Sequence, residues 1–547
     1  MSVVTVTVLS EGKLMDPIYE LVSLDIRKEV NRIPYAQLVL LDGDATKQTF
    51  AISDEPFFEP GKVIEIKLRY EDAPAQEATV FKGVVVGHGV EAGGQGSLLT
   101  VELKDAAIKL TYVRKSAIYR DQTDDKVIGQ IISNNGLKKG SVPATQPQHA
   151  QLVQYYCTDW DFILSRAEAQ GLLVMVDDGE ISLPAIALIG QPKHTFEYGL
   201  TDIFNFEIEA DAGHQYPDVQ SIAWDIKNQK LTKVAKAKDF KLSQSNLNGA
   251  KIAKTIGVES NLLASPVPLA PKELQAWSDA TLARSRMSMV KGRIAVPGFG
   301  DIKPLDIMEV SGIGKRFNGK TLVTGIRHQV SEQGWQTDVQ FGLAAERFVD
   351  RRDIVDVPAA GLLPAVNGLQ IGLVDQFEED PDKEFRVKVI LPGIDQKTGS
   401  IWARLASPDA GKDRGYFFRP EAGDEVVVGF FNDDPRQAVI LGAMYSSKNT
   451  PPKDVSKLTK KNIDKAIVTK TGTIIRFVDD SKSSVSIETP QANKIILDDD
   501  AQTIEIADQH GNTITMSKDG IVLKSAKDLK IDASGNVEIK GQKVDVK

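Results

Sequence analysis

Cysteine is almost absent from this chain, and paired metal ligands are missing. Cys157 is the single cysteine among 547 residues, so neither an internal disulfide bond nor a Cys-based metal site can form. The six histidines show no metal-ligating spacing, and Asp498-Asp499-Asp500 lacks the alternating positions and closing Glu of a calcium loop. The G-x-S-x-G elbow of hydrolases is also missing. We therefore expect no metal, no cofactor and no catalytic residues, with Cys157 as a core thiol.

Long apolar runs and an excess of positive charge are missing too. No run approaches the roughly 18–20 apolar residues that cross a bilayer, and the first residues, MSVVTVTVLSEGKL, lack the pattern of a secretory signal. The net charge of −9 disfavours a general binder of nucleic acid or anionic membranes. Hydrophobic residues make up 41% and charged residues 26%, as in soluble globular proteins. The length favours about three or four domains.

Aromatic residues are nearly absent from residues 451–547. Phe477 is the single aromatic there, out of 36 in the chain, whereas the same stretch holds 13 Ile and 8 Val. Apolar residues recur in i, i+2 pairs, with turn-forming residues between the pairs. This is typical of short strands stacked in a β-helix or β-prism. The pairs are Ile475/Phe477, Val485/Ile487, Ile495/Leu497, Ile504/Ile506, Ile514/Met516, Ile521/Leu523, Leu529/Ile531, Val537/Ile539 and Val544/Val546.

The apolar row of this repeat is too narrow to make a core from one chain. Identical chains wound round one axis would enclose the row and leave no open strand edge. We therefore predict an intertwined oligomer, with a monomeric β-solenoid or ordinary hairpins as the alternatives. The predicted core residues are Ile495, Leu497, Ile504, Ile506, Ile514, Met516, Ile521, Leu523, Leu529, Ile531, Val537, Ile539, Val544 and Val546.

Residues 366–450 predict a small barrel of five short strands, as in the OB-fold. The expected strands are Leu369–Val374, Phe385–Ile390, Ile401–Leu405, Glu425–Phe431 and Ala438–Met444, and Asn432-Asp433-Asp434-Pro435 is expected to form a hairpin turn. The segment carries 14 acidic against 10 basic residues, which disfavours binding of nucleic acid strands. We expect a structural collar.

The first 365 residues are predicted to be mostly strands with a few helices. Between residues 116 and 185 we expect a helix over Asp124–Ser133 and another that begins after Thr158, with Asp161 at its third position, and ends at Gly171. A further helix is expected near Lys272–Met287. Residues 314–321 match the phosphate-loop pattern G-x-x-x-x-G-K-[ST], but the following residues, 321–330, are rich in β-branched side chains. They predict a hairpin loop rather than a nucleotide site.

Several of these motifs resemble one known family. The stretch RPEAGDEVVVGFFNDDPRQAVILGAMY (residues 419–445), followed by NTPP, resembles the barrel of VgrG spike proteins, and DWDFILSRA (residues 159–167) resembles their hub signature. The resemblance implies a mainly β chain with two hub β-barrels at 1–115 and 186–365 and an α/β insert at 116–185. It further implies an OB-fold collar at 366–450, a linker at 451–470 and an intertwined trimeric β-helix needle at 471–547.

The resemblance also implies a function. It predicts a homotrimeric structural spike of a contractile injection machine, whose hub contacts a hexameric inner tube and baseplate proteins and whose needle punctures a target membrane. A PAAR-like tip protein is expected on Gln542, Lys543, Val544, Asp545, Val546 and Lys547. Assembly is expected in the bacterial cytoplasm and action outside the cell. The short linker and the final rung predict no added effector domain.

The sequence favours one type of injection machine and leaves three alternatives open. The run GLQIGLVDQFEEDPDKEFRVKVILP (residues 368–392) favours an extracellular phage-tail-like particle, with a type VI secretion VgrG or a phage tail spike as the runner-up. The alternative of a different class is an enzyme, either a phosphate-loop nucleotide-binding protein or a polysaccharide-cleaving one. The short repeat disfavours the latter.

Overall fold

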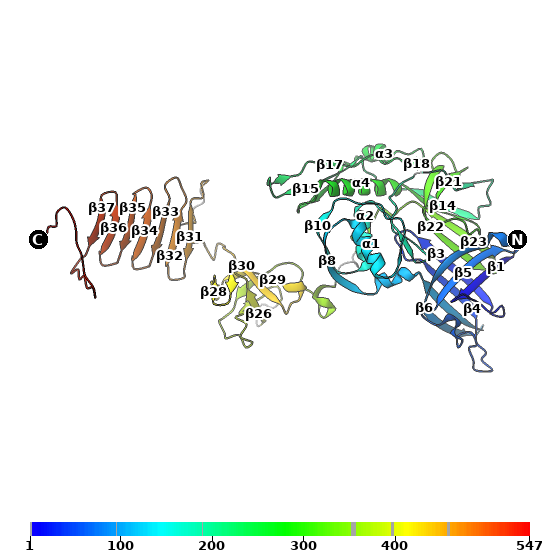
Figure 1. Ribbon diagram of the computed structural model, residues 1–547, viewed down its shortest axis with the longest axis horizontal. Helices are drawn as coiled ribbons and strands as arrows, with labels where there is room; N and C mark the ends of the chain where they lie inside the picture. Colours follow the sequence, from blue (N-terminus) through cyan, green and yellow to red (C-terminus); the bar gives the residue numbers. More distant parts are fainter. Residues whose placement is uncertain are drawn as a thin grey trace. The chain divides into compact units, whose positions relative to one another are not determined.

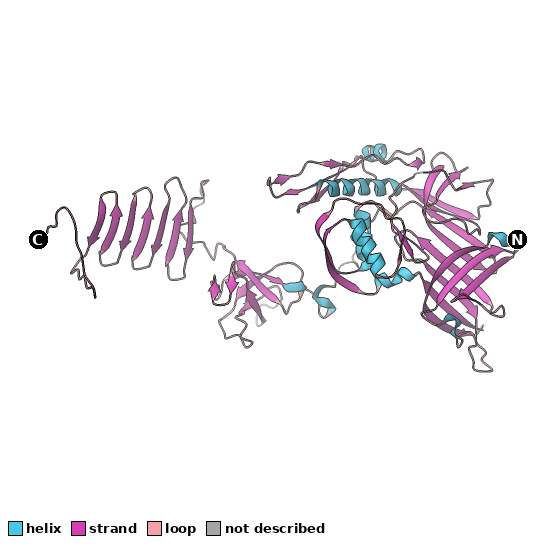
Figure 2. Ribbon diagram, in the orientation of Figure 1, coloured by secondary structure: helices cyan, strands magenta, loops and turns pink. Residues whose placement is uncertain are grey.

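The computed structural model describes residues 3–94, 96–188, 190–351, 357–394, 399–453, 455–456 and 460–547. Residues 352–356 of the predicted second hub barrel and residues 454 and 457–459 of the predicted linker lie outside this described part. The chain divides into two compact units, Met1–Asp356 and Val357–Lys547. Strands dominate both units, which confirms the predicted mainly β class (Figure 2).

The first unit, which we call the hub, is built on one sheet of 14 strands (Figure 1). Its strands alternate polar and apolar residues; in β5 (Val63–Tyr70), Ile64, Ile66 and Leu68 are fully buried. The other strands are β1 (Val4–Ser10), β2 (Lys13–Leu14), β3 (Leu21–Glu29), β4 (Tyr35–Leu41), β6 (Ala78–Gly93), β7 (Gly96–Lys104), β13 (His194–Glu197), β14 (Asn205–Ala210), β18 (Ser243–Gln244), β20 (Val290–Pro297), β21 (Ile307–Ser311), β22 (Gly319–Ser331) and β23 (Gly334–Phe341).

The strands of the two predicted hub barrels form one shared sheet, and the described hub residues close no separate barrel. Antiparallel pairing of β22 with β3 joins the strands before residue 105 to those after residue 193. Two hydrophobic cores form on this sheet, and Trp335 from the second set of strands joins the first core. Leu24, Leu38 and Phe81 belong to the first core, and Val323 and Phe341 belong to the second.

The predicted α/β insert lies between the two sets of strands. It contains β8 (Arg114–Gln122), α1 (Asp124–Asn134), β9 (Lys138–Lys139), β10 (His149–Thr158), α2 (Asp159–Ala169), β11 (Met175–Asp177) and β12 (Glu180–Ser182). Both predicted helices are confirmed. The Asp161 backbone N–H donates to Thr158 Oγ1 at 3.0 Å, which is the expected N-cap of α2. Cys157 is half-buried beside the insert's core rather than inside it.

Two further helices follow in the hub. The predicted one is α4 (Pro271–Met287), which packs on a small sheet of β15 (Val219–Asp225), β16 (Lys230–Leu231), β17 (Ala235–Lys236) and β19 (Asn261–Ser265). The other, α3 (Gly249–Ile256), was not predicted. Its signals are present in the sequence, because the Asn248 side chain caps its first turn and Gly257 ends it with φ of 88°.

The second unit begins with the predicted five-stranded barrel, the collar. It closes in the order β24 (Gln370–Val374), β25 (Val387–Ile390), β26 (Ser400–Leu405), β30 (Ala438–Ala443) and β29 (Glu425–Phe430), around a core of mostly Val, Ile and Leu. A two-stranded hairpin, β27 (Ala410–Gly411) with β28 (Arg414–Gly415), lies in the β26–β29 connection. The predicted turn lies between β29 and β30, and its residues Asn432 and Asp433 both have φ of 54°, a turn conformation that Asn and Asp tolerate.

The rest of the unit is an antiparallel ladder of seven five-residue strands (Figure 1). They are β31 (Asp464–Val468), β32 (Ile474–Val478), β33 (Ser484–Glu488), β34 (Lys494–Asp498), β35 (Thr503–Ala507), β36 (Thr513–Ser517) and β37 (Gly520–Lys524). Turn-forming residues at 499–500, 510–512 and 518–519 lie between these strands, and Asp498 ends β34. The first rung, β31, falls within the range predicted as linker.

One part of the strand prediction is wrong. The described chain after Lys524 contains no strand in this single-chain structure. The last three predicted pairs therefore lie outside strands: Leu529/Ile531, Val537/Ile539 and Val544/Val546. Each rung there offers two aliphatic side chains, worth about 1.5–3 kcal/mol each when fully buried. Fixing the backbone of seven or eight residues costs roughly 1–2 kcal/mol per residue. Within a single chain such a rung is not favourable.

Candidate oligomerisation face and the buried ion pairs of the hub

The ladder has one apolar face, made by Ile467 of β31 and by the second and fourth residue of each later strand; Lys465 takes the second position of β31. Antiparallel register places these residues opposite one another: Ile495 faces Ile506, which faces Ile514 on the next strand. The result is two adjacent columns that run the length of the ladder. One column holds Ile467, Ile475, Ile487, Ile495, Ile506, Ile514 and Leu523; the other holds Phe477, Val485, Leu497, Ile504, Met516 and Ile521.

These columns are exposed in the single chain. Ten of the thirteen side chains show 40–67% of their surface to solvent. Full burial of a large aliphatic side chain contributes about 1.5–3 kcal/mol, so each retains roughly 1 kcal/mol to be gained by covering. A continuous exposed apolar surface of this kind marks an interaction site.

The opposite face of the ladder mixes paired charges and polar side chains with apolar residues such as Ile474, Ile496 and Val522. Arg476 Nη2 lies 2.5 Å from Asp464 Oδ1 on the neighbouring strand, and Lys494 Nζ lies 3.0 Å from Glu505 Oε1. These ion pairs lie at a solvated surface, where each contributes about 0–1 kcal/mol. The first face is a continuous apolar surface and the second is mixed, so we expect the first to be the face that another chain covers.

The structure brings together eight of the predicted core residues. Ile495, Leu497, Ile504, Ile506, Ile514, Met516, Ile521 and Leu523 share the apolar face. Leu529 lines a groove of about 590 Å³ over the first column, together with Ile506, Ile514 and Leu523. The remaining five, Ile531, Val537, Ile539, Val544 and Val546, lie outside strands and are 54–92% exposed.

The predicted tip-binding residues form no strand either. Gln542–Lys547 are all exposed, and Lys543 Nζ pairs with Asp545 Oδ2 at 3.0 Å within the segment. They form the C-terminal end of the described chain after the ladder.

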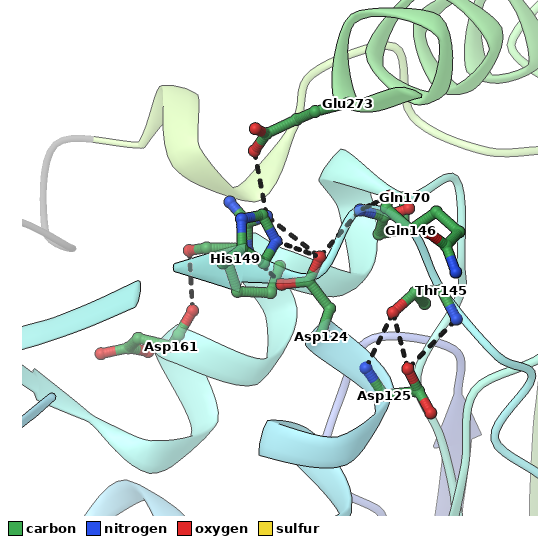
Figure 3. Close-up of polar contacts among 10 residues, drawn as sticks. Asp124, Asp125, Thr145, Gln146, His149, Asp161, Gln170 and Glu273 are labelled. Atoms are coloured by element: carbon green, nitrogen blue, oxygen red, sulfur yellow. Dashed lines mark hydrogen bonds and ion pairs between the residues drawn. The ribbon is translucent and has the colours of Figure 1, made fainter. Parts of the chain in front are cut away.

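A second feature, which sequence reasoning missed, is a buried ionic cluster in the hub insert (Figure 3). Asp124, the first residue of α1, is fully buried. Its carboxylate accepts hydrogen bonds from Arg166 Nε at 2.6 Å and from Gln170 Nε2 at 2.8 Å, and His149 Nε2 lies 3.2 Å away. Arg166 also donates to Glu273 Oε1 at 3.2 Å. The cluster therefore ties α1, β10, α2 and α4 together.

The electrostatics of this cluster follow from pairing. Burial alone would raise the pKa of Asp124, but the hydrogen bonds and charge of Arg166 hold that pKa below its ordinary value. Arg166 shows the mirror effect: burial lowers its pKa, yet Asp124 and Glu273 bring it above the ordinary value. Both groups stay charged at neutral pH, and the cluster acts as a clamp. Arg166 lies in the DWDFILSRA motif, but helix patterns give no signal for its partner 42 residues earlier.

Other sequence candidates have structural roles. The phosphate-loop match is the connection between β21 and β22, which pair antiparallel, and Lys320 lies on β22 with its Nζ 3.1 Å from Gln191 Oε1. A phosphate loop needs a helix at this point, so the predicted hairpin is confirmed. Among the described residues, no group of three His, Cys, Asp or Glu side chains is placed to hold a metal ion. No helix in the described ranges is both long and apolar enough to span a bilayer.

The fold thus defines a class of protein: a β-rich structural protein with a folded hub, a barrel collar and an uncovered apolar ladder. Comparison with known families places it more closely. The chain belongs to the family described as the Alg8 N-terminal domain, whose model matches residues 1–332, more than half of the chain. Residues 370–445 match the type VI secretion system/phage-baseplate injector OB domain, and residues 484–547 match the phage baseplate V C-terminal trimerisation domain.

Similar proteins agree with these matches. The type VI secretion system spike protein VgrG1a of Pseudomonas aeruginosa is 24% identical, over 76% of this chain and 67% of that protein. VgrG1b of the same organism is 23% identical, over 76% of this chain and 58% of that protein. A tail protein structure from Neisseria meningitidis MC58 has a TM-score of 0.46 and 16% identity, covering 63% of this chain and 98% of that chain.

The chain spans about two thirds of the length of VgrG1a and less of VgrG1b. With the family matches, these relatives confirm the predicted resemblance: the protein is a VgrG-like structural spike of a contractile injection system.

Proposed function

We propose that three copies of this chain assemble through the apolar face of the ladder into the needle of an injection machine. The observation that carries the proposal is the double apolar column, most of which lies in the residues that match a trimerisation domain. Three such faces turned toward one axis would enclose the columns and leave the ion-paired face in water. This arrangement also removes open strand edges, which otherwise promote aggregation.

The collar supports the same assembly. Tyr416, Phe417 and Phe418 are consecutive aromatic side chains with 58%, 68% and 62% of their surface exposed. Aromatic residues are enriched at protein interfaces because they bury a large area with few rotatable bonds. We propose that they pack against neighbouring copies around the axis.

The proposed mechanism is mechanical. Sheath contraction would drive the needle into a target membrane, and the hydrogen-bonded rungs would carry the load along the ladder. Three hubs would present six sets of strands, which suits docking onto a hexameric inner tube and baseplate. Assembly in the bacterial cytoplasm and action outside the cell complete the proposal.

We assign the C-terminal residues Gln542–Lys547 to a PAAR-like tip protein. Their exposure supports this assignment, because nothing in the described chain covers them. A chain ending at Gly541 should keep its mass as an assembly and lose the tip protein in pull-down. Retention of the tip protein by the shortened chain would place the binding site elsewhere.

The assembly itself is tested by mass. Size-exclusion chromatography with light scattering should give about 180 kDa, three times the chain mass of 59.7 kDa. A mass near 60 kDa at micromolar concentration contradicts the proposal.

Three types of machine remain candidates. An extracellular phage-tail-like particle is the first. A type VI secretion VgrG is favoured instead by the names of the two Pseudomonas relatives, and a phage tail spike by the baseplate family descriptions. Recovery of the protein in sedimentable particles from culture medium supports the extracellular particle; recovery only from cells that carry an anchored apparatus supports type VI secretion.

A further inference from the structure

The hub contains a basic region that stands apart from the acidic character of the chain. Residues 224–241 hold six lysines and two aspartates, whereas the chain as a whole carries a net charge of −9. These residues form the end of β15, the strands β16 and β17, and the segments around them. In Figure 2 the strands of this small sheet reach beyond the end of helix α4.

One face of the small sheet is covered by α4, and the other is buried at Ile222 and exposed at Trp224. On the covered face, Ser221 Oγ donates to the Leu274 carbonyl of α4 at 2.8 Å, and Ser278 Oγ of α4 donates to Ser221 Oγ at 2.8 Å. Side chains alternate along a strand, so Ile222 and Trp224 point away from α4. Trp224 pairs directly with Leu231 of β16, which therefore shares its face.

This outer face has an apolar centre. Trp224 is 37% exposed, Leu231 is 55% exposed, and Leu262 on the neighbouring strand β19 is 51% exposed. Leu231 lies directly beside Trp224, whereas Leu262 lies beside Gln220, further along β15. An exposed tryptophan with an adjacent leucine is typical of the centre of protein interfaces, where Trp contributes most per residue.

Lysines form the rim of this centre. Lys227, Lys230, Lys233, Lys236, Lys238 and Lys241 are all exposed. Lys236 pairs with Asp218 at 3.1 Å and Lys238 with Asp279 at 3.6 Å. In the described part of the chain, Lys227, Lys233 and Lys241 make no ion pair. Lys230 lies directly across from Asp225 and interacts electrostatically with it, so this pair occupies the face opposite Trp224 at the edge of the sheet.

We propose that this surface, the lysine-rimmed face of β15, β16 and β19, docks an acidic protein segment that carries apolar side chains between its carboxylates. The apolar side chains would cover Trp224 and Leu231, and the carboxylates would lie against the lysine rim. Charge complementarity of this kind sets partner choice and association rate. The proposal is independent of the ladder and of the assembly through it.

The same surface suits two other ligand classes less well. Nucleic acid strands are held by tracks of stacking aromatics, and Trp224 is the one aromatic side chain of this face. Membrane-inserting loops carry their apolar residues at the tip. Here the tip, Ile226–Gln229, has one apolar residue, and the Trp lies on the flat sheet.

The test uses the full-length protein and a fluorescein-labelled 12-residue peptide of alternating Glu and Leu, followed by fluorescence anisotropy. We expect binding that weakens as salt rises from about 50 to 300 mM, because exposed charges are screened. The triple variant Lys227→Glu, Lys230→Glu, Lys233→Glu should weaken binding at least about tenfold. A matched triple, Lys13→Glu, Lys109→Glu, Lys126→Glu, changes the charge equally at exposed hub lysines elsewhere and should stay within about twofold.

A second readout reports contact at the apolar centre. Peptide binding should reduce acrylamide quenching of tryptophan fluorescence, and this protection should disappear in Trp224→Phe while the anisotropy signal persists. Equal loss in both triple variants, or no loss in the first, overturns the proposal. Tighter binding of phosphatidylserine vesicles or of a thymidine 20-mer than of the peptide, lost in the first triple, would assign the surface to a phosphate-bearing ligand instead and also overturn it.

Discussion

Leu523→Asp and Val522→Asp together test the needle proposal with two neighbouring residues. Both side chains lie on β37 and are similarly exposed in the single chain, at 57% and 59%. Leu523 faces Ile514 in the first apolar column, whereas Val522 faces Thr515 on the opposite face. Exposure within one chain predicts the same small effect for both substitutions, so any difference between them reports which face is covered in the assembly.

The expected difference is large. In a closed trimer, Leu523→Asp removes about 1–2 kcal/mol of apolar burial per chain and buries a carboxylate without a partner, which costs several kcal/mol more. Three copies together lose on the order of 10 kcal/mol, equivalent to about seven orders of magnitude in the association constant. Val522→Asp leaves its carboxylate in water and should change the assembly by less than about 1 kcal/mol.

The assay is sedimentation velocity of the two variants across a range of concentrations at neutral pH. We expect a trimer for Val522→Asp and dissociated chains for Leu523→Asp. Burial raises the pKa of the introduced carboxyl, so the trimer binds more protons than the separate chains, and association should improve as pH falls through that raised pKa. Trimers of equal stability for both variants, or dissociation of both, would refute the inward assignment of the columns.

Three predictions concern the hub. Arg166→Ala should lower the free energy of unfolding by about 3–5 kcal/mol in a denaturant titration, because Asp124 then stays buried without its cationic partner. In the wild type, the pKa of Asp124 is lowered in the folded state, so the stability that its charged form contributes is complete above about pH 4 and is lost as the pH falls further. Thr158→Ala should cost about 1 kcal/mol and Thr123→Ala less, since only Thr158 makes a side-chain cap hydrogen bond. Burial lowers the pKa of His328 from 6.5 to about 3, so hub stability should decline as pH falls from 6.5 toward 3, and His328→Gln should flatten that decline in thermal melts.

Local patterns predicted the elements whose signals lie close together in the sequence. The alternation Val63-Ile64-Glu65-Ile66 is the local signal of β5, and the capping spacing from Thr158 to Asp161 predicted the start of α2. Asn248 before α3 and Gly257 after it are the same kind of local signal, although no helix was predicted there.

Contacts between residues far apart in the chain could not be predicted from the sequence. Asp124 and Arg166 are first and eighth in two separate helices, and no spacing rule pairs them. The same limit applies to the pairing of β22 with β3, which joins two sets of strands that look independent along the chain. The i, i+2 pairs did predict which ladder residues share a face, because that depends on alternation alone. They overestimated the strands after Lys524, where alternation continues but one chain offers too little burial.

The hub buries its apolar residues within one chain, whereas the ladder needs other copies of the chain to cover its apolar residues. The stability of the ladder should therefore depend on protein concentration, and that of the hub should not. The hub encloses Leu24, Phe81, Val323 and Phe341 within one chain, so its unfolding does not depend on concentration. The ladder exposes its columns until other copies cover them, so its stability should rise with protein concentration by mass action. Calorimetry should therefore show two transitions, of which only one shifts with concentration. Leu523→Asp should lower or abolish the shifting transition and leave the other in place. A single transition that is independent of concentration would mean that the ladder is stabilised within its own chain.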